Sequence, residues 1–337
     1  MLDFSTNTNS LGPPHSLIRV LRENVFDVSA YPDYKNKKIL SACGRFFGVS
    51  FKNIGLGTGS TQILFNIPKM LQYKRAVIIV PTFWEYANFN LLFKRRIKKI
   101  NLLEEDNFEP NYESIQKNIR SGDCVFICNV NNPTSSIYVK HKLLGLIKGN
   151  PHVQFVIDET YLLFRSDYTR QSVVKYVQKQ KNLHVVTSLS KLFAIPGMRV
   201  GIFVSNRKII ELYNKLFYVP YSINSYSSKS LIDLLSNGVF VEETRNFYDA
   251  ERKRLYEIIK KKLSHRLRCI EPHGNFIFVR ILTSQTSQDI ETCLKRRGII
   301  IRGGHELLGV TNKWFRFSIG KKKDNNRFIR ELNKVVH

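Results

Sequence analysis

The chain has 337 residues, of which 43% are hydrophobic and 24% are charged, an ordinary composition for a globular protein. Its 53 Lys and Arg residues outnumber its 27 Asp and Glu residues, which gives a formal net charge of +26 at pH 7. The length exceeds what a single core usually serves, so we expect a large domain and a smaller one. The sequence has no long uncharged apolar stretch, which argues against a transmembrane helix.

The strong positive charge raises the question of a nucleic-acid partner. Nucleic-acid binding is typically carried by one basic stripe or tail that neutralises phosphates. Here the basic clusters lie far apart in sequence, at 35–38, 94–99, 260–262 and 321–323. This distribution favours a generally basic surface over a dedicated nucleic-acid site.

The five cysteines are odd in number and contain no Cys-x-x-Cys pair. Two of them lie in "CVFIC", an apolar run in which cysteine behaves as a small hydrophobic residue. We therefore expect free thiols and no metal site. The N-terminal "MLDFSTNTNS" lacks the basic and apolar parts of a secretory signal, so we expect a cytoplasmic protein.

Short apolar runs rich in β-branched residues recur through the first two thirds of the chain. Each is almost continuously hydrophobic, which is typical of strands covered on both faces. Segments of helical character, at 61–71, 85–93 and 140–147, lie between them. This alternation predicts an α/β fold with a doubly wound, mostly parallel sheet. The expected strands are 54–56, 76–80, 124–130, 154–158, 184–188 and 200–204.

The pattern changes after about residue 225. One long charged helix is expected at 227–262, followed by strands in "NFIFVRI", "GIIIRGG" and "WFRFSIG", a helix near 287–297 and a final helix. This succession predicts a smaller α+β domain. The expected organisation is an N-terminal arm (1–28), a large domain (29–225) and a small C-terminal domain (226–337).

Ligands of such sheets bind beyond the carboxyl ends of the strands, so the residues that follow each strand matter most. "GTGST" (57–61) follows the first strand, and its glycines and hydroxyls before a helix suit either a phosphate or an ordinary helix cap. "PTFWEY" follows the next strand. Phe83 and Trp84 in it could stack on a flat ring or pack in the core.

Polar residues also follow the next two strands. Asn131 and Asn132 come after 124–130, either as turn formers or as amides aimed at a ligand. Asp158 ends "QFVID", and a buried carboxylate needs a partner such as an arginine or a protonated ring nitrogen. Tyr161 could hydrogen-bond the same ring.

The stretch "SLSKLFAIPGMRVG" (188–201) places a lysine in apolar surroundings. Desolvation lowers the pKa of a lysine, and the free amine is a nucleophile that forms Schiff bases with aldehydes. Ser188 and Ser190 flank Lys191, and Arg199 follows. A phosphate cradle, a stacking aromatic ring, a buried carboxylate and an amine are together what pyridoxal phosphate requires.

On these motifs the chain resembles the fold-type I pyridoxal-phosphate enzymes of the class I/II aminotransferase family over nearly its whole length. Within that family it is most similar to the L-threonine-O-3-phosphate decarboxylases and next to the histidinol-phosphate aminotransferases. The resemblance rests on "DFSTNTNSLGPP", "YPD", "GTGST", "PTFWEY", "NNPT", "DETY", "SLSKLFAIPGMRVG", "YSIN", "GIIIRGG" and "FRFSIG". "NNPTS" departs from the usual "NNPTG" of the family, because Ser135 replaces the glycine.

The resemblance implies a role for each matching residue. Lys191 would carry the cofactor and move the proton at the substrate's α-carbon, and Asp158 would keep the ring nitrogen protonated. Tyr161 and Asn132 would bind the phenolic oxygen, and Phe83 would stack on the ring. The phosphate would be held by Gly59, Ser60, Thr61, Ser188, Ser190 and Arg199, and by Tyr31 from a second subunit.

The resemblance also implies a small anionic amino-acid substrate and a homodimer with shared active sites. Arg316 matches the residue that binds the substrate carboxylate, Arg302 the residue that meets a second anion, and Asn7 a further substrate contact. Decarboxylation of a phosphorylated amino acid is the expected reaction, with transamination of the histidinol-phosphate type as the alternative. A distant alternative is a non-catalytic anion- or nucleic-acid-binding protein on the same fold.

Overall fold

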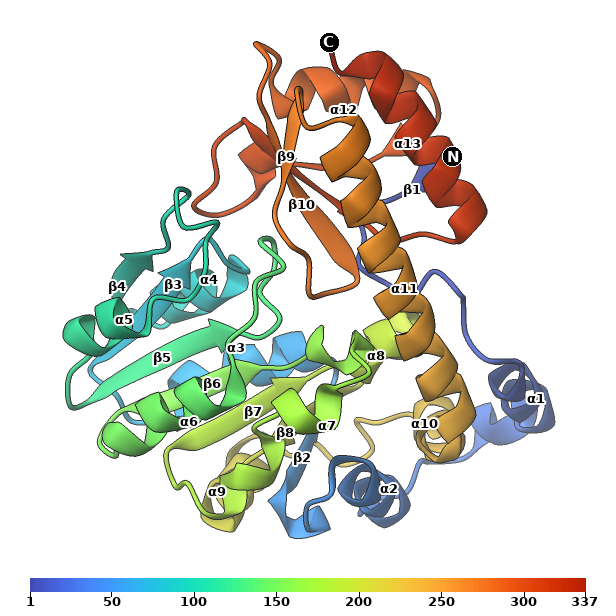
Figure 1. Ribbon diagram of the computed structural model, residues 1–337. Helices are drawn as coiled ribbons and strands as arrows, with labels where there is room; N and C mark the ends of the chain where they lie inside the picture. The colour runs from blue at the N-terminus through green and yellow to red at the C-terminus, as the bar shows by residue number, and fades with distance from the viewer.

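A computed structural model of the chain describes residues 1–337 and has a seven-stranded sheet at its centre, with helices on both faces (Figure 1). The strand order is β2-β8-β7-β6-β5-β3-β4. Every strand is parallel to the others except β8, which runs antiparallel to both neighbours. The strands are β2 (Ile54–Gly57), β3 (Arg75–Val80), β4 (Arg96–Asn101), β5 (Asp123–Cys128), β6 (Gln154–Asp158), β7 (Leu183–Thr187) and β8 (Gly201–Val204). The expected α/β fold with a mostly parallel sheet is confirmed.

The central strands β5 and β7 are buried at every position, as their continuous apolar sequences predict. Strand β4 was not expected, because its sequence "RIKKIN" reads as a basic cluster. It lies at the edge of the sheet, and five of its six residues, all except Ile100, are exposed or half-buried. Lysines on an edge strand discourage pairing with another sheet. Part of the positive charge therefore has a structural explanation.

Some helices of this part of the chain cover the two faces of the sheet, and others belong to the N-terminal segment (Figure 1). Several begin with a side-chain cap; for example, Asn206 accepts a hydrogen bond from the backbone N–H of Ile209. The helices are α1 (His15–Glu23), α2 (Lys37–Phe47), α3 (Ser60–Met70), α4 (Glu85–Leu92), α5 (Tyr112–Asn118), α6 (Lys140–Gly149), α7 (Tyr168–Gln171), α8 (Leu189–Leu192) and α9 (Arg207–Phe217).

A smaller antiparallel sheet, in the order β12-β13-β10-β9, lies above the large one in Figure 1. Its strands are β9 (Leu267–Cys269), β10 (Phe276–Ile281), β12 (Arg302–Gly303) and β13 (Trp314–Ser318), and α12 (Ser287–Arg296) and α13 (Lys322–Val335) accompany them. The N-terminal strand β1 (Leu2–Asp3) pairs in parallel with β11 (Ile299–Ile300). The first residues of the chain are thereby tied to its C-terminal part.

The single helix expected at 227–262 is wrong in one respect, because the structure has two helices there. They are α10 (Ser225–Ser236) and α11 (Gly238–Lys262), separated by Asn237. The Asn237 side chain accepts a hydrogen bond from the backbone N–H of Phe240 and so caps the start of α11. The interruption was not expected, although "SNG" (236–238) is a turn signal, because residues of helical character continue on both sides of it.

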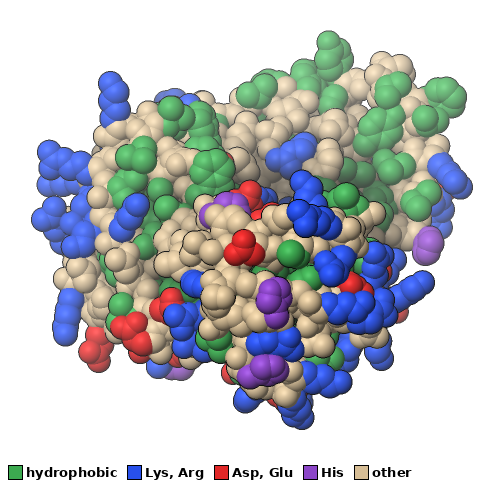
Figure 2. Space-filling view, turned by 90° about the horizontal axis from the view of Figure 1, so that it is seen from above, with side chains coloured by type: hydrophobic (Ala, Val, Ile, Leu, Met, Phe, Trp, Pro, Cys, Tyr) green, Lys and Arg blue, Asp and Glu red, His purple; other side chains and the backbone are tan.

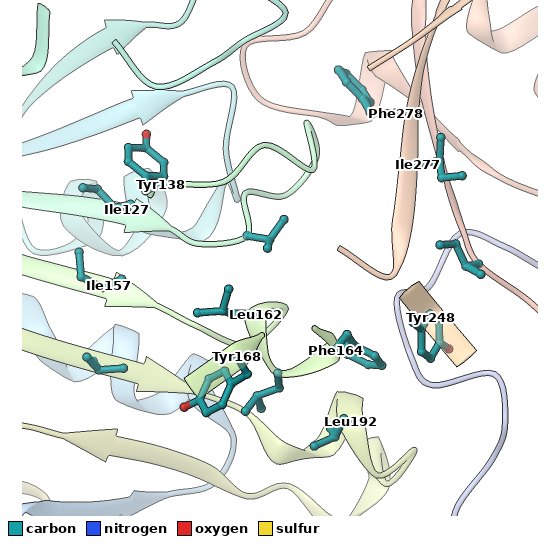
Figure 3. Close-up of a cluster of buried hydrophobic side chains, with 14 of the residues drawn as sticks. Ile127, Tyr138, Ile157, Leu162, Phe164, Tyr168, Leu192, Tyr248, Ile277 and Phe278 are labelled. Carbon is teal, nitrogen blue, oxygen red and sulfur yellow. The ribbon is translucent and has the colours of Figure 1, made fainter. Parts of the chain in front are cut away.

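One hydrophobic cluster of 67 buried residues runs through both sheets. Figure 3 shows members of this cluster from the large sheet, such as Ile127 and Ile157, and from the small one, Ile277 and Phe278. Because the two parts share a core, side chains from both can meet in one site at fixed positions.

On the surface, Lys and Arg side chains occur at several separate places around the face drawn in Figure 2. The scattered distribution inferred from the sequence is thus also seen on this face. None of the helices combines the length and the apolar character needed to cross a membrane.

Candidate active site

Two adjoining cavities lie where the strands of the large sheet end. The inner cavity has a volume of about 190 Å³ and the outer cavity one of about 370 Å³. Both are lined by Phe83, Asn132, Tyr161 and Lys191, so they form one continuous site. The inner cavity brings together Gly59, Ser60, Thr61, Phe83, Asn132, Asp158, Tyr161, Ser188, Ser190, Lys191 and Arg199, which are all the predicted cofactor residues except Tyr31. Asn7, Arg302 and Arg316, the predicted substrate residues, line the outer cavity.

The topology of the sheet explains this convergence. Parallel strands present their carboxyl ends at one edge, and segments that follow them meet there. Asp158 is the last residue of β6, and Ser188 follows the last residue of β7. Phe83 and Asn132 follow β3 and β5 after short loops.

Asp158 is buried at the floor of the inner cavity. Its Oδ2 accepts a hydrogen bond from the Tyr86 hydroxyl at 2.9 Å, and its Oδ1 accepts one from the backbone N–H of Thr160 at 3.0 Å. Burial raises the pKa of the Asp158 carboxyl, while the hydrogen bonds from Thr160 and Tyr86 oppose that rise. Sequence reasoning did not identify Tyr86, although it belongs to "PTFWEY" and lies one helical turn beyond Phe83.

Another part of the inner cavity's lining consists of glycines, hydroxyls and a guanidinium. Gly59 has φ +85°, and a Cβ there would lie 2.6 Å from Nη2 of Arg199. A Cβ on Gly201 would lie 2.3 Å from the backbone N of Ser60. Ser60 begins the 11-residue helix α3, whose N-terminal N–H groups favour anions. Only glycines allow the guanidinium and this helix start to come so close.

Lys191 belongs to the short helix α8 and lines the same cavity. Burial lowers the pKa of its amine, and the positive charges of Arg316 and Arg199 lower it further. Because the ammonium form is disfavoured on both counts, more of the amine is in the nucleophilic form at neutral pH.

The chemistry of the inner cavity fits pyridoxal phosphate. The cofactor needs an anion partner for its ring nitrogen, a cradle for its phosphate, a surface for its ring and an amine for its aldehyde. Asp158, the Gly59–Ser60 turn with Arg199, Phe83 and Lys191 offer these four features in one cavity. The structure therefore holds a donor set matched to this cofactor at every functional group.

The two asparagines in the loop after β5 have different surroundings. The Asn131 amide donates to the carbonyl of Pro81 at 2.8 Å and accepts from the Thr82 hydroxyl at 3.0 Å, so it ties two strand-end loops together. Asn132 instead faces both cavities. Further along the loop, Ser135 is fully buried with φ +61°. That left-handed conformation costs a residue with a Cβ roughly 1–2 kcal/mol, so the "NNPTS" loop keeps a glycine-like shape despite the serine.

In the outer cavity, Arg302 and Arg316 lie directly opposite each other on the antiparallel strands β12 and β13. Arg316 is buried, and burial lowers the pKa of its guanidinium to about 10, which leaves it protonated at neutral pH. It donates hydrogen bonds to Oδ1 of Asn132 and to the carbonyl of Ser5. Arg302 forms an ion pair with Glu306, with Nη1 and Oε2 2.7 Å apart and the side chains 40% and 39% exposed.

Asn7 comes from the N-terminal segment, far from the other site residues in sequence. Its side chain is 3% exposed, and neither atom of its amide has a hydrogen-bond partner of good geometry within the chain, although the amide lies close enough to the Tyr161 phenol to lower its pKa. A buried polar group without a partner is costly, and both amide atoms belong to a residue that lines the outer cavity. This is the behaviour expected of a group that contacts a ligand.

Tyr31 lines neither cavity. It is 85% exposed, and its ring lies 4.9 Å from that of Tyr221. Its contact with the cofactor phosphate of a second subunit remains a prediction.

Comparison with known proteins shows which family the chain belongs to. The model of the family described as aminotransferase class I and II matches residues 1–332. The threonine-phosphate decarboxylase of Salmonella typhimurium is 25% identical, over 100% of this chain and 91% of that protein. The histidinol-phosphate aminotransferase of Methanococcus maripaludis is also 25% identical, over 100% of this chain and 90% of that protein.

Solved structures are similar over the same extent. The histidinol-phosphate aminotransferase from Clostridium acetobutylicum has a TM-score of 0.91 and 28% identity, covering 99% of both chains. The L-threonine-O-3-phosphate decarboxylase from Porphyromonas gingivalis has a TM-score of 0.85 and 19% identity, also covering 99% of both chains. The chain therefore belongs to the class I and II aminotransferase family and is a pyridoxal-phosphate-dependent enzyme with the fold-type I architecture.

Proposed function

Starting from membership of this family, we propose that the enzyme removes the α-carboxyl group of a phosphorylated amino acid as carbon dioxide. The observation that carries the proposal is the placement of Arg302 and Arg316 opposite each other on β12 and β13, at the cavity that Lys191 also lines. Two neighbouring guanidinium groups suit a small molecule with two anionic groups. An amino-acid phosphate carries two such groups, a carboxylate and a phosphate.

The residues of the inner cavity would prepare the reaction. Bound pyridoxal phosphate supplies a ring that withdraws electrons from the α-carbon. Asp158 would hold the proton on the ring nitrogen, and Lys191 would be the attachment point of the cofactor. After the carboxyl group leaves as carbon dioxide, Lys191 in its ammonium form would deliver a proton to the α-carbon and become the free amine. Burial raises the pKa of the Tyr161 phenol to about 12, so Tyr161 would stay neutral and donate a hydrogen bond.

The outer cavity would orient the substrate. Arg316 is buried and hydrogen-bonded to Asn132 and Ser5, so it would bind the substrate carboxylate at a fixed position. Arg302 is more exposed and would meet the phosphate after exchanging its bond to Glu306. The unpartnered amide of Asn7 would contact the substrate between them.

Transamination is the second candidate, and the hydrogen bond from Arg316 to Asn132 favours it. Asn132 is also a proposed contact of the cofactor, so a carboxylate on Arg316 would be held beside it. Transamination keeps the carboxyl group of the substrate, which would then stay bound to Arg316 while Lys191 accepts the α-proton.

One assay separates the two reactions. The purified enzyme is incubated with O-phospho-L-threonine, and separately with histidinol phosphate and 2-oxoglutarate. Carbon dioxide release with the first substrate, without any oxo acid, supports the proposal. Glutamate formation with the second and no carbon dioxide with the first would replace decarboxylation by transamination.

The active enzyme is proposed to be a cytoplasmic homodimer. All five cysteines are free, as expected in a reducing compartment.

The dimer is supported by exposed apolar side chains near Tyr31. Phe26, Val28 and Tyr31 are 85%, 76% and 85% exposed, and an apolar surface of this kind favours burial against another chain. Mixed refolding of Tyr31→Ala and Lys191→Ala subunits should restore part of the activity, because one of the two sites then has both residues. A monomer that is fully active would contradict the dimer.

A further inference from the structure

Ser135, the residue at which the chain departs from the usual family motif, links the two halves of the site. Its hydroxyl donates a hydrogen bond to the carbonyl of Phe276 at 3.1 Å and accepts hydrogen bonds from the backbone N–H groups of His273 at 3.0 Å and Gly274 at 2.8 Å. The backbone carbonyl of Ser135 also accepts from the N–H of His273 at 3.0 Å. The hydroxyl thus has its full set of one donated and two accepted hydrogen bonds.

These bonds join segments that belong to different sheets. Ser135 lies in the loop after β5 of the large sheet, and Phe276 begins β10 of the small one. Arg252 binds the same stretch of backbone, because its Nη1 donates hydrogen bonds to the carbonyls of His273 at 3.2 Å and Gly274 at 3.1 Å. Both the N–H and the carbonyl of Gly274 are therefore held by side-chain hydrogen bonds.

Both segments that Ser135 joins also contact the Arg316 guanidinium. Asn132, three residues before Ser135, accepts a hydrogen bond from Nη1 of Arg316. The Phe276 ring lies under the guanidinium, with Cζ 5.5 Å from the ring centroid, and its ring centroid is 5.0 Å from that of Tyr161. A change in the distance between the loop and β10 would therefore change the surroundings of Arg316 on two sides.

We propose that Ser135 is a positioning residue that sets the orientation of Arg316 relative to Asn132 through its hydroxyl. The inference deepens the proposed function, since it rests on Arg316 as the carboxylate-binding group. A glycine at this position would adopt the same backbone conformation without strain but would leave the N–H of Gly274 and the carbonyl of Phe276 without this partner. The serine accepts an unfavourable backbone conformation and supplies three hydrogen bonds in return.

Two substitutions separate positioning from stability. Ser135→Ala loses the hydroxyl and keeps the backbone strain, whereas Ser135→Gly loses the hydroxyl and relieves the strain. We therefore expect the melting temperature of the glycine variant to lie above that of the alanine variant. If the hydroxyl positions Arg316, both variants should lose carboxylate affinity to the same extent, despite their different stabilities.

The probe is succinate, which has carboxylates but no amine and so cannot react. Its dissociation constant is measured from the change in cofactor absorption of the loaded enzyme, beside the dissociation constant of the cofactor itself. We expect about tenfold weaker succinate binding in both variants, equivalent to a change of about 1.4 kcal/mol, and cofactor binding within about twofold of the unaltered enzyme. Ser136→Ala is the matched control, because that buried hydroxyl contacts the Thr134 hydroxyl of the same loop at 2.7 Å and should not change succinate binding.

Normal succinate binding by Ser135→Gly, with a defect only in the less stable Ser135→Ala, would overturn the inference and leave a purely structural serine. An equal loss in both variants supports it. Failure of the proposed function is a separate result, since it appears as the absence of carbon dioxide from an amino-acid phosphate in the unaltered enzyme.

Discussion

The inner and outer cavities are built in different ways from the same chain. The inner cavity takes its polar residues from segments that directly follow strands of one sheet, such as Gly59, Asp158 and Lys191. The outer cavity combines the N-terminal segment, the loop after β3 and the small sheet, with residues as distant as Asn7 and Arg316. On the proposed roles, cofactor chemistry is expected to depend on one sheet, and substrate recognition on how two parts of the chain are held together.

The two halves also differ in their electrostatics. The inner cavity contains both a buried carboxylate, Asp158, and a guanidinium, Arg199, which suits one particular cofactor. The outer cavity has two arginines, of which Arg316 is buried and fixed and Arg302 is half-exposed and paired with Glu306. Specificity is therefore expected to change more readily in the outer cavity. Substitutions in the two halves should have effects of different kind and size.

Lys191→Ala is expected to have the largest effect. The amine is proposed both to attach the cofactor and to transfer the proton, and general acid–base catalysis alone contributes about 10²- to 10⁴-fold. Turnover should fall by at least that factor, and borohydride should no longer fix the cofactor to the peptide that contains residue 191. Lys208→Ala, on the exposed side of α9, is the control. Full turnover in the Lys191 variant would show that the inner cavity is not the catalytic centre.

Asp158→Ala should weaken cofactor binding by about 10- to 100-fold and lower turnover at least as much. A hydrogen bond to a charged group contributes about 1.5–3 kcal/mol, and an unprotonated ring is a poorer electron acceptor. Asp158→Glu should retain more activity than the alanine variant because it keeps a carboxylate. Cofactor affinity is measured by titrating the apoprotein and following absorption. Equal affinity and activity in all three proteins would show that Asp158 only supports the fold.

Arg302→Ala tests whether the outer cavity selects phosphate. Loss of one charged contact should lower kcat/KM by about 10- to 100-fold with O-phospho-L-threonine and little with L-threonine. Equal losses with both compounds would mean that Arg302 serves only its ion pair with Glu306.

Glu306→Gln sharpens that test. An exposed ion pair contributes about 0.2–1 kcal/mol, so freeing Arg302 should tighten binding of the phosphorylated compound by up to about fivefold. Glu211→Gln is the matched control, because Glu211 pairs with Arg207 at the same 2.7 Å and the same i,i+4 spacing outside the site. A similar gain in that control would attribute the effect to net charge alone.

Glu159→Gln should have the smallest effect on turnover and a visible one on stability. Glu159 is buried behind the site, where its carboxyl accepts hydrogen bonds from the Ser172 hydroxyl at 2.6 Å and the N–H of Val173 at 2.8 Å. Burial raises its pKa from 4.5 to about 7. The folded state thus keeps a proton that the unfolded chain releases, and this contribution to stability is complete below pH 4.5 and lost as the pH rises to about 7.

The glutamine variant should lack this pH dependence. The free energies of unfolding of the two proteins, measured in urea, should diverge between pH 4.5 and 7 by up to roughly 3 kcal/mol in favour of the variant. Parallel pH profiles would show that the carboxyl titrates normally. In that case the buried Glu159 carboxyl does not lower the free energy of unfolding at neutral pH.

Local sequence determined most of the inner cavity. Continuous apolar runs predicted β5, β6 and β7 within two residues, because strands buried on both faces have no polar side to obscure them. The polar residues that end them, Asp158 above all, then had to converge at one edge of the sheet. The isolated lysine in an apolar motif indicated the nucleophile for the same reason, since desolvation is a local property.

The tertiary structure alone decided the rest. Strand β4 was hidden by its basic residues, which are common to edge strands and exposed helices and so carry little information about either. The break at Asn237 was hidden because residues of helical character continue on both sides of it. The bond of Tyr86 to Asp158, the pairing of Arg302 with Glu306 and the contacts of Ser135 with β10 join residues that local patterns do not relate or do not orient. Hydrogen bonds depend on distances of a few tenths of an ångström, and only the packing of the shared core sets distances of that kind between separate segments.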